Sequence, residues 1–334
     1  MYYKNIIFHQ ADLSQYSFLV TGGAGFIGSH IVEYLLTHNA KKIRILDDFS
    51  NGFRQNIEEF LKDERVELLE GDIKDFDTCL KACEGIDFIS HQAALGSVPR
   101  SIKFPRDTNA ANVDGFLNMI TAAKDSGVKR MVYASSSSVY GDSKNLPKVE
   151  EITGNLLSPY AVSKYVNELY AGVFNKVYGL EIMGLRYFNI FGPRQNPKGP
   201  YAAAIPLFME ALLNNTSPEI HGDGGQTRDF TFVENAVQAN IRALFTENAK
   251  AYGKVFNVAV GDRVSIQQMF EDVKAATNAS VEPNHTAPRQ GDIRDSLANI
   301  SLAEELLAYN PQVKFTEGIQ RTLVWFKEYL KNQY

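Results

Sequence analysis

A tyrosine and a lysine stand four residues apart, at Tyr160 and Lys164, directly after the helix-starting pair Ser158-Pro159. Residues at this spacing share one face of a helix. The pKa of a phenol is about 10, and a neighbouring ammonium group lowers this pKa by stabilising the phenolate. Four serines, Ser135 to Ser138, lie 22 to 25 residues before the tyrosine and offer hydroxyls that could orient an alcohol. The pattern predicts a site that removes a hydroxyl proton, although Y-x-x-x-K alone is also a common surface pair.

A glycine-rich turn near the N-terminus supplies a partner for that chemistry. The stretch FLVTGGAGFIGSH, Phe18 to His30, places an apolar strand, a glycine turn and an apolar helix in succession, and residues 23–28 match G-x-G-x-x-G. The N–H groups at the start of such a helix bind a pyrophosphate. A second strand ends at Asp47, where a carboxylate accepts from a ribose 2′-OH and repels a 2′-phosphate. These features predict bound NAD as hydride acceptor, against the alternative of a glycine turn without a ligand.

Strands and helices alternate along the first half of the chain. The expected strands are residues 18–20, 43–46, 66–69, 86–89, 131–133 and 181–187. This alternation without hairpin signals predicts an α/β fold with a Rossmann-like, doubly wound parallel sheet. A loop rich in glycine and proline follows Asn189 and opens a smaller C-terminal α/β lobe. We expect an NAD-binding domain over 1–188, to which 231–262 is a candidate to return, and a second lobe over 189–334.

Composition limits the possible partners. The 334 residues carry a net charge of −5 without a long basic cluster, which argues against nucleic-acid binding. No apolar run approaches membrane-spanning length, and Met1 to Gln10 lacks the apolar core of a signal peptide. Cys79 and Cys83, four apart, are interpreted as small helix residues in a reducing compartment. We therefore expect a cytoplasmic protein with no membrane contact, and an N-terminal extension, residues 1–16, that forms a short helix on the surface.

Several motifs in fixed order resemble a nucleotide-sugar 4-epimerase of the extended short-chain dehydrogenase/reductase family. They are TGGAGFIGSH, Asp47, Gly71-Asp72-Ile73, SSSVYG, SPYAVSK, LRYFNIFGPRQ and TRDF, within a similarity from about Phe18 to about Leu330. The resemblance implies bound NAD, a UDP-sugar substrate, and catalytic roles for Ser136, Ser137, Tyr160 and Lys164. It also implies that the lobe over 189–334 binds the nucleotide sugar. The expected cofactor-binding residues are Gly22, Gly25, Phe26, Ile27, Gly28, Asp47, Asp48, Phe49, Ser50, Asn51, Gly52, Asp72, Ile73, Gln92, Ala93, Ala94, Asn112, Tyr160, Lys164 and Tyr187. The expected substrate-binding residues are Gly96, Ser97, Ser136, Ser137, Tyr160, Asn189, Gln195, Ala203, Ala204, Arg228, Arg289, Asp292 and Ser296.

Some of these assignments have an alternative in the sequence itself. Asp72 could accept from an adenine amino group or cap the helix that follows it, and His91 is better explained as a packed histidine than as a catalyst. Arg228 and Arg289 suit a diphosphate because a guanidinium is always charged and forked, although each could also form a surface ion pair.

The serine stretch narrows the reaction within the family. Related 4,6-dehydratases carry an Asp-Glu pair, and uronate decarboxylases a Glu, just after the active-site hydroxyl, whereas this chain has Ser137-Ser138. The resemblance therefore implies reversible oxidation and reduction alone: C4 of the sugar loses hydride to NAD, the 4-keto sugar turns, and hydride returns to its other face.

The substrate is predicted from one loop position. The resemblance implies that Ser296 falls where enzymes limited to UDP-glucose and UDP-galactose carry a bulky tyrosine, so that space is left for an acetamido group, although Ser296 could also be an ordinary loop serine. We expect a UDP-N-acetylglucosamine/UDP-N-acetylgalactosamine 4-epimerase. The alternatives are an epimerase of UDP-glucuronate, UDP-N-acetylhexosaminuronate or UDP-glucose, and a non-catalytic NAD-binding sensor.

The helix that starts at Pro159 is apolar on more than one side, which predicts a protein partner. The resemblance implies a homodimer in which this helix and the helix over 110–126 form a four-helix bundle with the same helices of a second copy.

Overall fold

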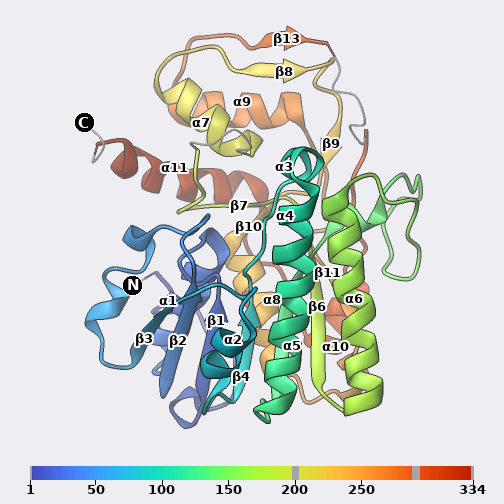
Figure 1. Cartoon of the computed structure of the whole chain (residues 1–334). Coiled ribbons are helices and arrows are strands. Elements are labelled where there is room, and N and C mark those ends of the chain that lie inside the picture. The colour runs from blue at the N-terminus through green and yellow to red at the C-terminus, as the bar shows by residue number, and fades with distance from the viewer. Residues whose placement is uncertain (1, 198–202, 288–293, 332–334) are drawn as a thin grey trace.

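The computed structural model describes residues 2–197, 203–287 and 294–331. Its centre is a seven-stranded sheet in the order β11-β6-β5-β4-β1-β2-β3, with every neighbouring pair parallel (Figure 1). The strands of this sheet are β1 (Ser17–Thr21), β2 (Lys42–Asp47), β3 (Val66–Glu70), β4 (Phe88–His91), β5 (Arg130–Ser136), β6 (Glu181–Tyr187) and β11 (Val255–Val258). β1 is buried at all five residues, as a parallel strand covered on both faces should be.

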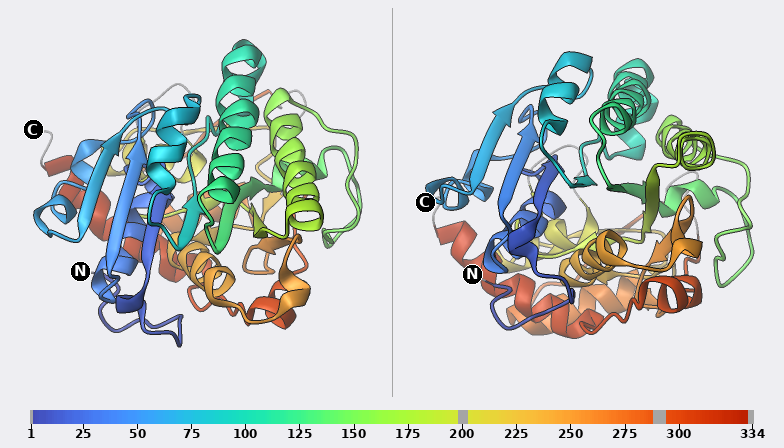
Figure 2. Two further views of the ribbon diagram at one scale, coloured as in Figure 1. Left: turned by 60° about the horizontal axis from the view of Figure 1, so that its bottom comes forward. Right: turned by 90° about the horizontal axis from the view of Figure 1, so that it is seen from below.

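Two layers of helices cover the sheet (Figure 2). One layer holds α1 (Phe26–Thr37), α8 (Val233–Phe245) and α10 (Ser301–Leu307), and the other holds α2 (Phe76–Cys83), α5 (Gly115–Asp125) and α6 (Pro159–Tyr178). The chain crosses from β1 to β2 on one side of the sheet and continues to β4 on the other side of β1. Such a switch of strand order opens a crevice at the carboxyl ends of the strands. The architecture confirms the predicted Rossmann-like, doubly wound fold.

A smaller lobe lies above the carboxyl ends of the strands in Figure 1. Its own apolar core includes Phe191, Phe208, Phe230, Phe270 and Phe326. Among the described residues, the other α-helices are α3 (Val98–Lys103) and α4 (Pro105–Asn109), which pack against α6 in the first domain, and α7 (Ala204–Leu213), α9 (Ile266–Thr277) and α11 (Phe315–Lys331), in the lobe. The short strands pair as β7 (Ile190–Phe191) with β10 (Thr231–Phe232), β9 (Thr227–Arg228) with β12 (Val264–Ser265), and β8 (Glu219–His221) with β13 (Asn284–Thr286).

Helix α6 shows how local sequence sets an element. The Ser158 side chain accepts from the Ala161 N–H, Pro159 occupies the first turn, and the helix ends at Gly179 with φ +72°. The serine, proline and glycine signals together delimit a helix of 20 residues.

The N-terminal extension differs from its prediction. Its only helical turn among the described residues is the three-residue 3₁₀ turn Leu13–Gln15. Tyr3, Phe8 and Leu13 are 0%, 6% and 1% exposed and anchor the segment in the core beside α1, whereas its other described residues are exposed or only partly buried. Aromatic residues spaced without helical period pack as an extended segment because tertiary contacts, not backbone propensity, hold it.

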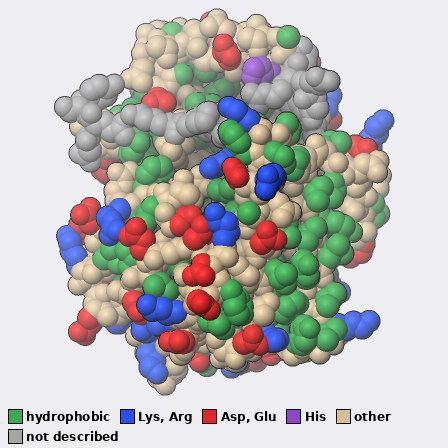
Figure 3. Space-filling model, in the orientation of Figure 1, with side chains coloured by type: hydrophobic (Ala, Val, Ile, Leu, Met, Phe, Trp, Pro, Cys, Tyr) green, Lys and Arg blue, Asp and Glu red, His purple; other side chains and the backbone are tan. Residues whose placement is uncertain are grey.

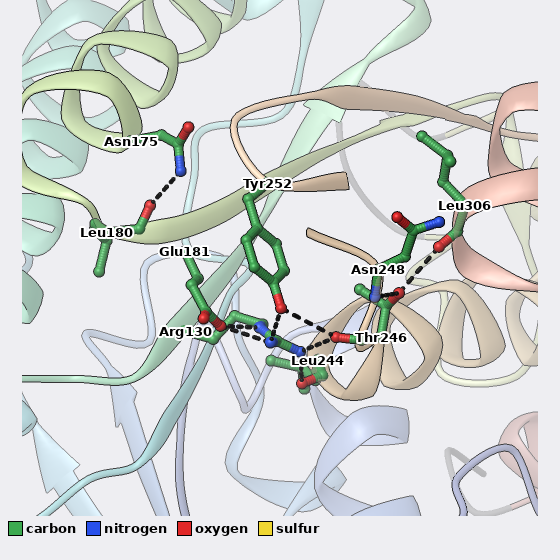
Figure 4. A network of polar contacts seen from close by, with 9 residues as sticks. All are labelled: Arg130, Asn175, Leu180, Glu181, Leu244, Thr246, Asn248, Tyr252 and Leu306. Carbon is green, nitrogen blue, oxygen red and sulfur yellow. Dashed lines mark hydrogen bonds and ion pairs between the residues drawn. The ribbon is translucent and has the colours of Figure 1, made fainter. Parts of the chain in front are cut away.

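A buried guanidinium joins the lower ends of three elements (Figure 4). Arg130 of β5 donates to the Glu181 carboxylate on β6 at 2.5 and 2.8 Å, and to the carbonyl oxygens of Leu244 and Thr246 at the C-terminal end of α8 at 2.7 and 2.8 Å. It also donates to the Tyr252 hydroxyl at 2.6 Å. All of its hydrogen-bonding directions meet acceptors, which is what makes a buried charge tolerable.

No helix within the described residues is long and apolar enough to cross a membrane. Within the same residues no group of histidine, cysteine and acidic side chains could hold a metal ion.

Candidate active site

A cleft of about 960 Å³ opens at the carboxyl ends of β1, β4, β5 and β6. Of the predicted site residues, it is lined by Gly22, Gly25, Phe26, Ile27, Gly28, Ser50, Asn51, Gln92, Ala94, Gly96, Ser97, Ser136, Tyr160, Lys164, Tyr187 and Asn189. The glycine loop and the tyrosine–lysine pair, more than a hundred residues apart in the chain, therefore face the same space. This follows from a parallel sheet, in which all strands deliver their next loop to one edge.

The glycine turn is shaped for a pyrophosphate. Gly22 has φ +64°, and a Cβ there would lie 2.7 Å from the backbone nitrogen of Ala93. A Cβ on Gly28 would collide with the carbonyl oxygen of Gly22. Only glycine permits this close approach of turn, helix and neighbouring strand. The first turn of α1 then directs unpaired N–H groups and the positive end of its dipole into the cleft, so the residues present fit a dinucleotide.

Asp47 supports the same turn from the end of β2. It is 6% exposed, and its carboxylate accepts from the N–H groups of Ala24 and Phe49, both at 2.9 Å. Burial raises the pKa of Asp47, and these hydrogen bonds oppose the rise. Each carboxylate oxygen retains a lone pair, so the predicted bond to a ribose 2′-OH stays possible in addition to this structural role.

A neighbouring cavity of about 320 Å³ continues the cleft past β2 and β3. The predicted residues that line it are Gly22, Gly25, Asp47, Asp48, Ser50, Asn51, Gly52, Asp72, Ile73, Gln92, Ala93 and Ala94. Asp72 does not cap α2, because the cap is Asp75, whose side chain accepts from the Thr78 N–H at 3.1 Å. Asp72 instead accepts from the Lys74 N–H at 2.9 Å and faces the cavity.

The predicted catalytic residues lie where β5 ends and α6 begins. Burial raises the pKa of Tyr160, and a hydrogen bond with the Ser136 hydroxyl opposes that rise. Lys164 is 3% exposed, and its Nζ donates to the carbonyl oxygen of Ala134 at 2.8 Å. Burial lowers the pKa of Lys164 to about 8, against an opposing effect of Glu168. A lysine poised in this range is charged at neutral pH and can stabilise a phenolate beside it.

A buried ion pair between Glu168 and Arg186 lies one helical turn after Lys164, and the sequence reasoning did not predict it. Glu168, one turn after Lys164 on α6, pairs with Arg186 of β6 at 2.8 Å and accepts from the Ser135 hydroxyl at 2.6 Å. The side chains of Arg186 and Glu168 are 3% and 7% exposed. Glu168 therefore joins α6, β5 and β6 close to the predicted catalytic residues. The i, i+4 spacing of lysine and glutamate could have signalled it.

Two more polar side chains position the loop after β4. Asn112 lies in a π-helical turn, Ala110–Asp114, and bonds both backbone groups of Leu95, accepting at 2.7 Å and donating at 3.2 Å. It also donates to the Ser163 hydroxyl at 3.1 Å. Asn112 thus lies behind the cleft and positions its wall without lining it. On the other side, the Tyr187 hydroxyl donates to Gln92 at 3.0 Å.

His91 is a packed histidine, as expected. It is 3% exposed, and its Nδ1 lies 2.8 Å from the Thr21 hydroxyl. Burial lowers the pKa of His91 to about 3, with a further contribution from the charge of Lys164. The side chain therefore stays neutral at every pH at which the protein would be assayed.

A second cavity, of about 320 Å³, meets the cleft at Asn189 and lies within the smaller lobe. Five predicted substrate residues line it, namely Asn189, Gln195, Ala203, Ala204 and Arg228. The Oε1 atom of Gln195 is buried without a hydrogen-bond partner among the described residues. An unpaired buried acceptor is costly and points to a donor on a ligand.

Not every predicted residue lines these spaces. Phe49 packs against the core, and Ser137 and Ser296 lie outside the cavity walls described here. Ser296 donates its N–H to the Thr227 carbonyl oxygen at 3.2 Å, next to Arg228. Arg289 and Asp292 lie outside the described residues.

Helix α3 adds wall residues that the sequence reasoning did not select. Arg100 lines both the cleft and the cavity beyond β2, and donates to Asn51 at 2.8 Å across the opening. Lys103 and Phe104 also line the cleft. The Ser97 cap, which accepts from the Arg100 N–H at 3.2 Å, is the sequence signal that could have located this short helix.

This geometry fits an enzyme that binds a dinucleotide and acts on an alcohol. Comparison with known proteins then identifies the family: the model of the NAD dependent epimerase/dehydratase family matches residues 18–259, and the chain belongs to that family. It is thus an epimerase-type enzyme with NAD as cofactor.

Its relatives are nucleotide-sugar enzymes. A UDP-glucose 4-epimerase of Mycolicibacterium smegmatis is 37% identical over 311 residues, 92% of this chain and 98% of the relative. The structure of a UDP-N-acetylglucosamine 4-epimerase from Methanobrevibacter ruminantium M1, in complex with UDP-N-acetylmuramic acid, aligns with a TM-score of 0.89 at 39% identity, covering 94% of this chain and 99% of that one. A UDP-glucuronic acid 4-epimerase from Bacillus cereus, in complex with UDP-glucuronic acid and NAD, aligns with a TM-score of 0.87 at 29% identity, covering 94% and 99%.

Proposed function

We propose that this enzyme interconverts UDP-N-acetylglucosamine and UDP-N-acetylgalactosamine by inverting C4 of the sugar. The observation that carries the proposal is the position of Tyr160, Lys164 and Ser136 beside Asn189, where the dinucleotide cleft meets the second cavity. The cleft suits NAD and the cavity suits a nucleotide diphosphate, so a sugar between them would have its alcohol carbon at the tyrosine.

The residues of the chain divide the work between proton transfer and positioning. Tyr160 takes the proton of the 4-hydroxyl and later returns it, while the Lys164 charge stabilises the phenolate form. Ser136 holds the reacting oxygen in line. Bound NAD supplies the acceptor, and then the donor, of the hydride. Held mainly through its nucleotide, the flat 4-keto sugar can turn before hydride returns to its other face.

Ser296 supports the choice of N-acetylated sugars. The family resemblance implies a tyrosine at this position in enzymes limited to UDP-glucose, whereas this chain has Ser296. The Ser296 N–H donates to the Thr227 carbonyl oxygen at 3.2 Å, next to Arg228, which lines the cavity of the smaller lobe. A small residue leaves volume for an acetamido group, whereas packed protein yields little. The relatives also act on UDP-glucose and UDP-glucuronic acid, so these substrates are the alternatives to test.

Product analysis tests the proposed reaction. Purified protein would be incubated with UDP-N-acetylglucosamine, UDP-glucose or UDP-glucuronic acid, without added NAD, and the products resolved by chromatography. We expect the highest kcat/KM for the N-acetylated sugar. A higher value for either of the other two would assign the protein to that substrate instead.

A tyrosine variant tests the mechanism. Tyr160→Phe should retain NAD and fold but lose about 10²- to 10⁴-fold in kcat, the range that general acid–base catalysis contributes. Tyr165→Phe, on the same helix and outside the cleft, is the matched control and should stay near wild type. Near wild-type turnover by Tyr160→Phe would exclude it as the base.

We also infer that the enzyme pairs through α6. Val162, Leu169, Val173 and Val177 are 47%, 55%, 52% and 63% exposed and fall on one face of that helix. Figure 3 shows hydrophobic side chains gathered on the right of the molecule, where Figure 1 places α6. A contiguous apolar face of this kind is typical of a protein interface. A second copy presenting α5 and α6 would complete a four-helix bundle.

A further inference from the structure

The N-terminal segment reaches the substrate-binding region through one buried histidine. Tyr3 is 0% exposed, and its hydroxyl oxygen lies 3.0 Å from Nδ1 of His30 on α1. The other ring nitrogen, Nε2, lies 2.9 Å from the carbonyl oxygen of Pro193. In Figure 1 the N-terminus lies beside α1, from which His30 bridges to a loop 163 residues further along the chain.

The chemistry of the three groups fixes the direction of these hydrogen bonds. A carbonyl oxygen can only accept, so Nε2 of His30 carries a proton and donates to Pro193. Burial holds the pKa of His30 well below its ordinary value, so the ring is neutral and Nδ1 is an acceptor. The Tyr3 hydroxyl therefore donates to Nδ1, and this bond favours the tautomer that donates to Pro193.

A second tie runs in parallel. Glu33, one turn after His30, accepts from the Tyr2 N–H at 2.6 Å and pairs with the Arg194 guanidinium. Arg194 also donates to the Ser29 hydroxyl at 3.4 Å. The side chains of Glu33 and Arg194 are 5% and 17% exposed, so the pair is largely shielded from water. Arg194 itself has φ +68°, a conformation that costs energy for a residue other than glycine and needs such contacts to persist.

The loop that these contacts hold, residues 193–196, also carries side chains that line the candidate site. Gln195 lines the cavity of the smaller lobe with its unpaired Oε1, and Asn196 lines the cleft. Both follow directly after Pro193 and Arg194. A displacement of the Pro193 carbonyl would therefore move the two side chains that face ligand at the junction of the two spaces.

We propose that Tyr3 and His30 form a positioning relay through which the N-terminal segment holds the substrate-binding loop. The inference rests on the proposed function, because it takes the second cavity to bind the nucleotide of the substrate. The relay acts on nucleotide affinity and not on proton or hydride transfer, since none of its atoms lines the cleft at Tyr160.

Tyr3→Phe tests the relay because it removes one hydroxyl and keeps the buried ring. We expect KM for the best UDP-sugar, and the dissociation constant of UDP measured by calorimetry, to rise about 5-fold, as the loss of one net hydrogen bond gives. The kcat and the amount of bound NAD should stay within about 2-fold of the wild-type values, because the variant leaves the catalytic groups in place. The ¹⁵N shifts of the His30 ring should move toward a tautomer mixture.

Tyr34→Phe is the matched control. The Tyr34 hydroxyl accepts from the Phe8 N–H and meets Nδ1 of His9, both at 2.7 Å, so it ties down the same segment without touching His30. This variant should lower stability and leave the affinity for UDP unchanged. An unchanged UDP affinity in Tyr3→Phe, or an equal loss in Tyr34→Phe, would overturn the relay. A wild-type protein that binds no UDP would instead contradict the proposed function.

Discussion

Replacing His91 with glutamine should make the protein more resistant to acid. His91 ends β4 in the core of the first domain, and burial lowers its pKa to about 3. In the unfolded chain the pKa of the same imidazole is about 6.5. At a pH between these two pKa values, His91 is protonated in the unfolded state and neutral in the folded state. Falling pH therefore favours unfolding.

The size of the effect follows from the difference between the two pKa values. Each pH unit between about 6.5 and about 3 lowers the free energy of unfolding by about 1.4 kcal/mol. At about pH 4.5 the loss from His91 alone is about 3 kcal/mol relative to about pH 7.5, where neither state is protonated. Glutamine does not titrate, so His91→Gln should lack this part of the acid destabilisation.

Urea unfolding at the two pH values, followed by circular dichroism at one NAD concentration, measures this loss for each protein. His9 and His30, whose pKa values burial also lowers, contribute equally to wild type and variant, so their effect cancels in the difference. His285→Gln, at an exposed position on β13, is the control and should behave as wild type. Equal losses in His91→Gln and wild type would refute the reasoning.

Three further changes test the assembly, the selectivity and the core. Leu169→Glu places a charge on the exposed apolar face of α6 and should give a monomer by light scattering; a wild-type monomer at micromolar concentration would already contradict the interface. Ser296→Tyr should lower kcat/KM for N-acetylated sugars far more than for UDP-glucose, and equal losses would show that residue 296 does not determine substrate selectivity. Tyr252→Phe removes one acceptor of Arg130 and should cost about 1 kcal/mol of unfolding free energy by urea titration.

The sequence alone was enough to predict the class of fold and to select residues that meet in one cleft. The glycine turn at 22–28, the strand end at Asp47 and the Tyr160/Lys164 pair are local patterns, each determined by neighbours within one or two turns. Their order along a strand–helix alternation implies one sheet edge, because parallel strands all deliver their loops to the same side.

Only the tertiary structure determined which contacts position the residues of the site. Glu168 and Arg186 meet under Lys164 only because α6 packs on β6, and Asp72 faces a cavity because Asp75 takes the capping position. The N-terminal segment carries no periodic pattern, and its place beside α1 depends on contacts such as that of Tyr3 with His30. Pairs so distant along the chain leave no local signal, since their energy comes from burial and hydrogen bonding that exist only once the chain has folded.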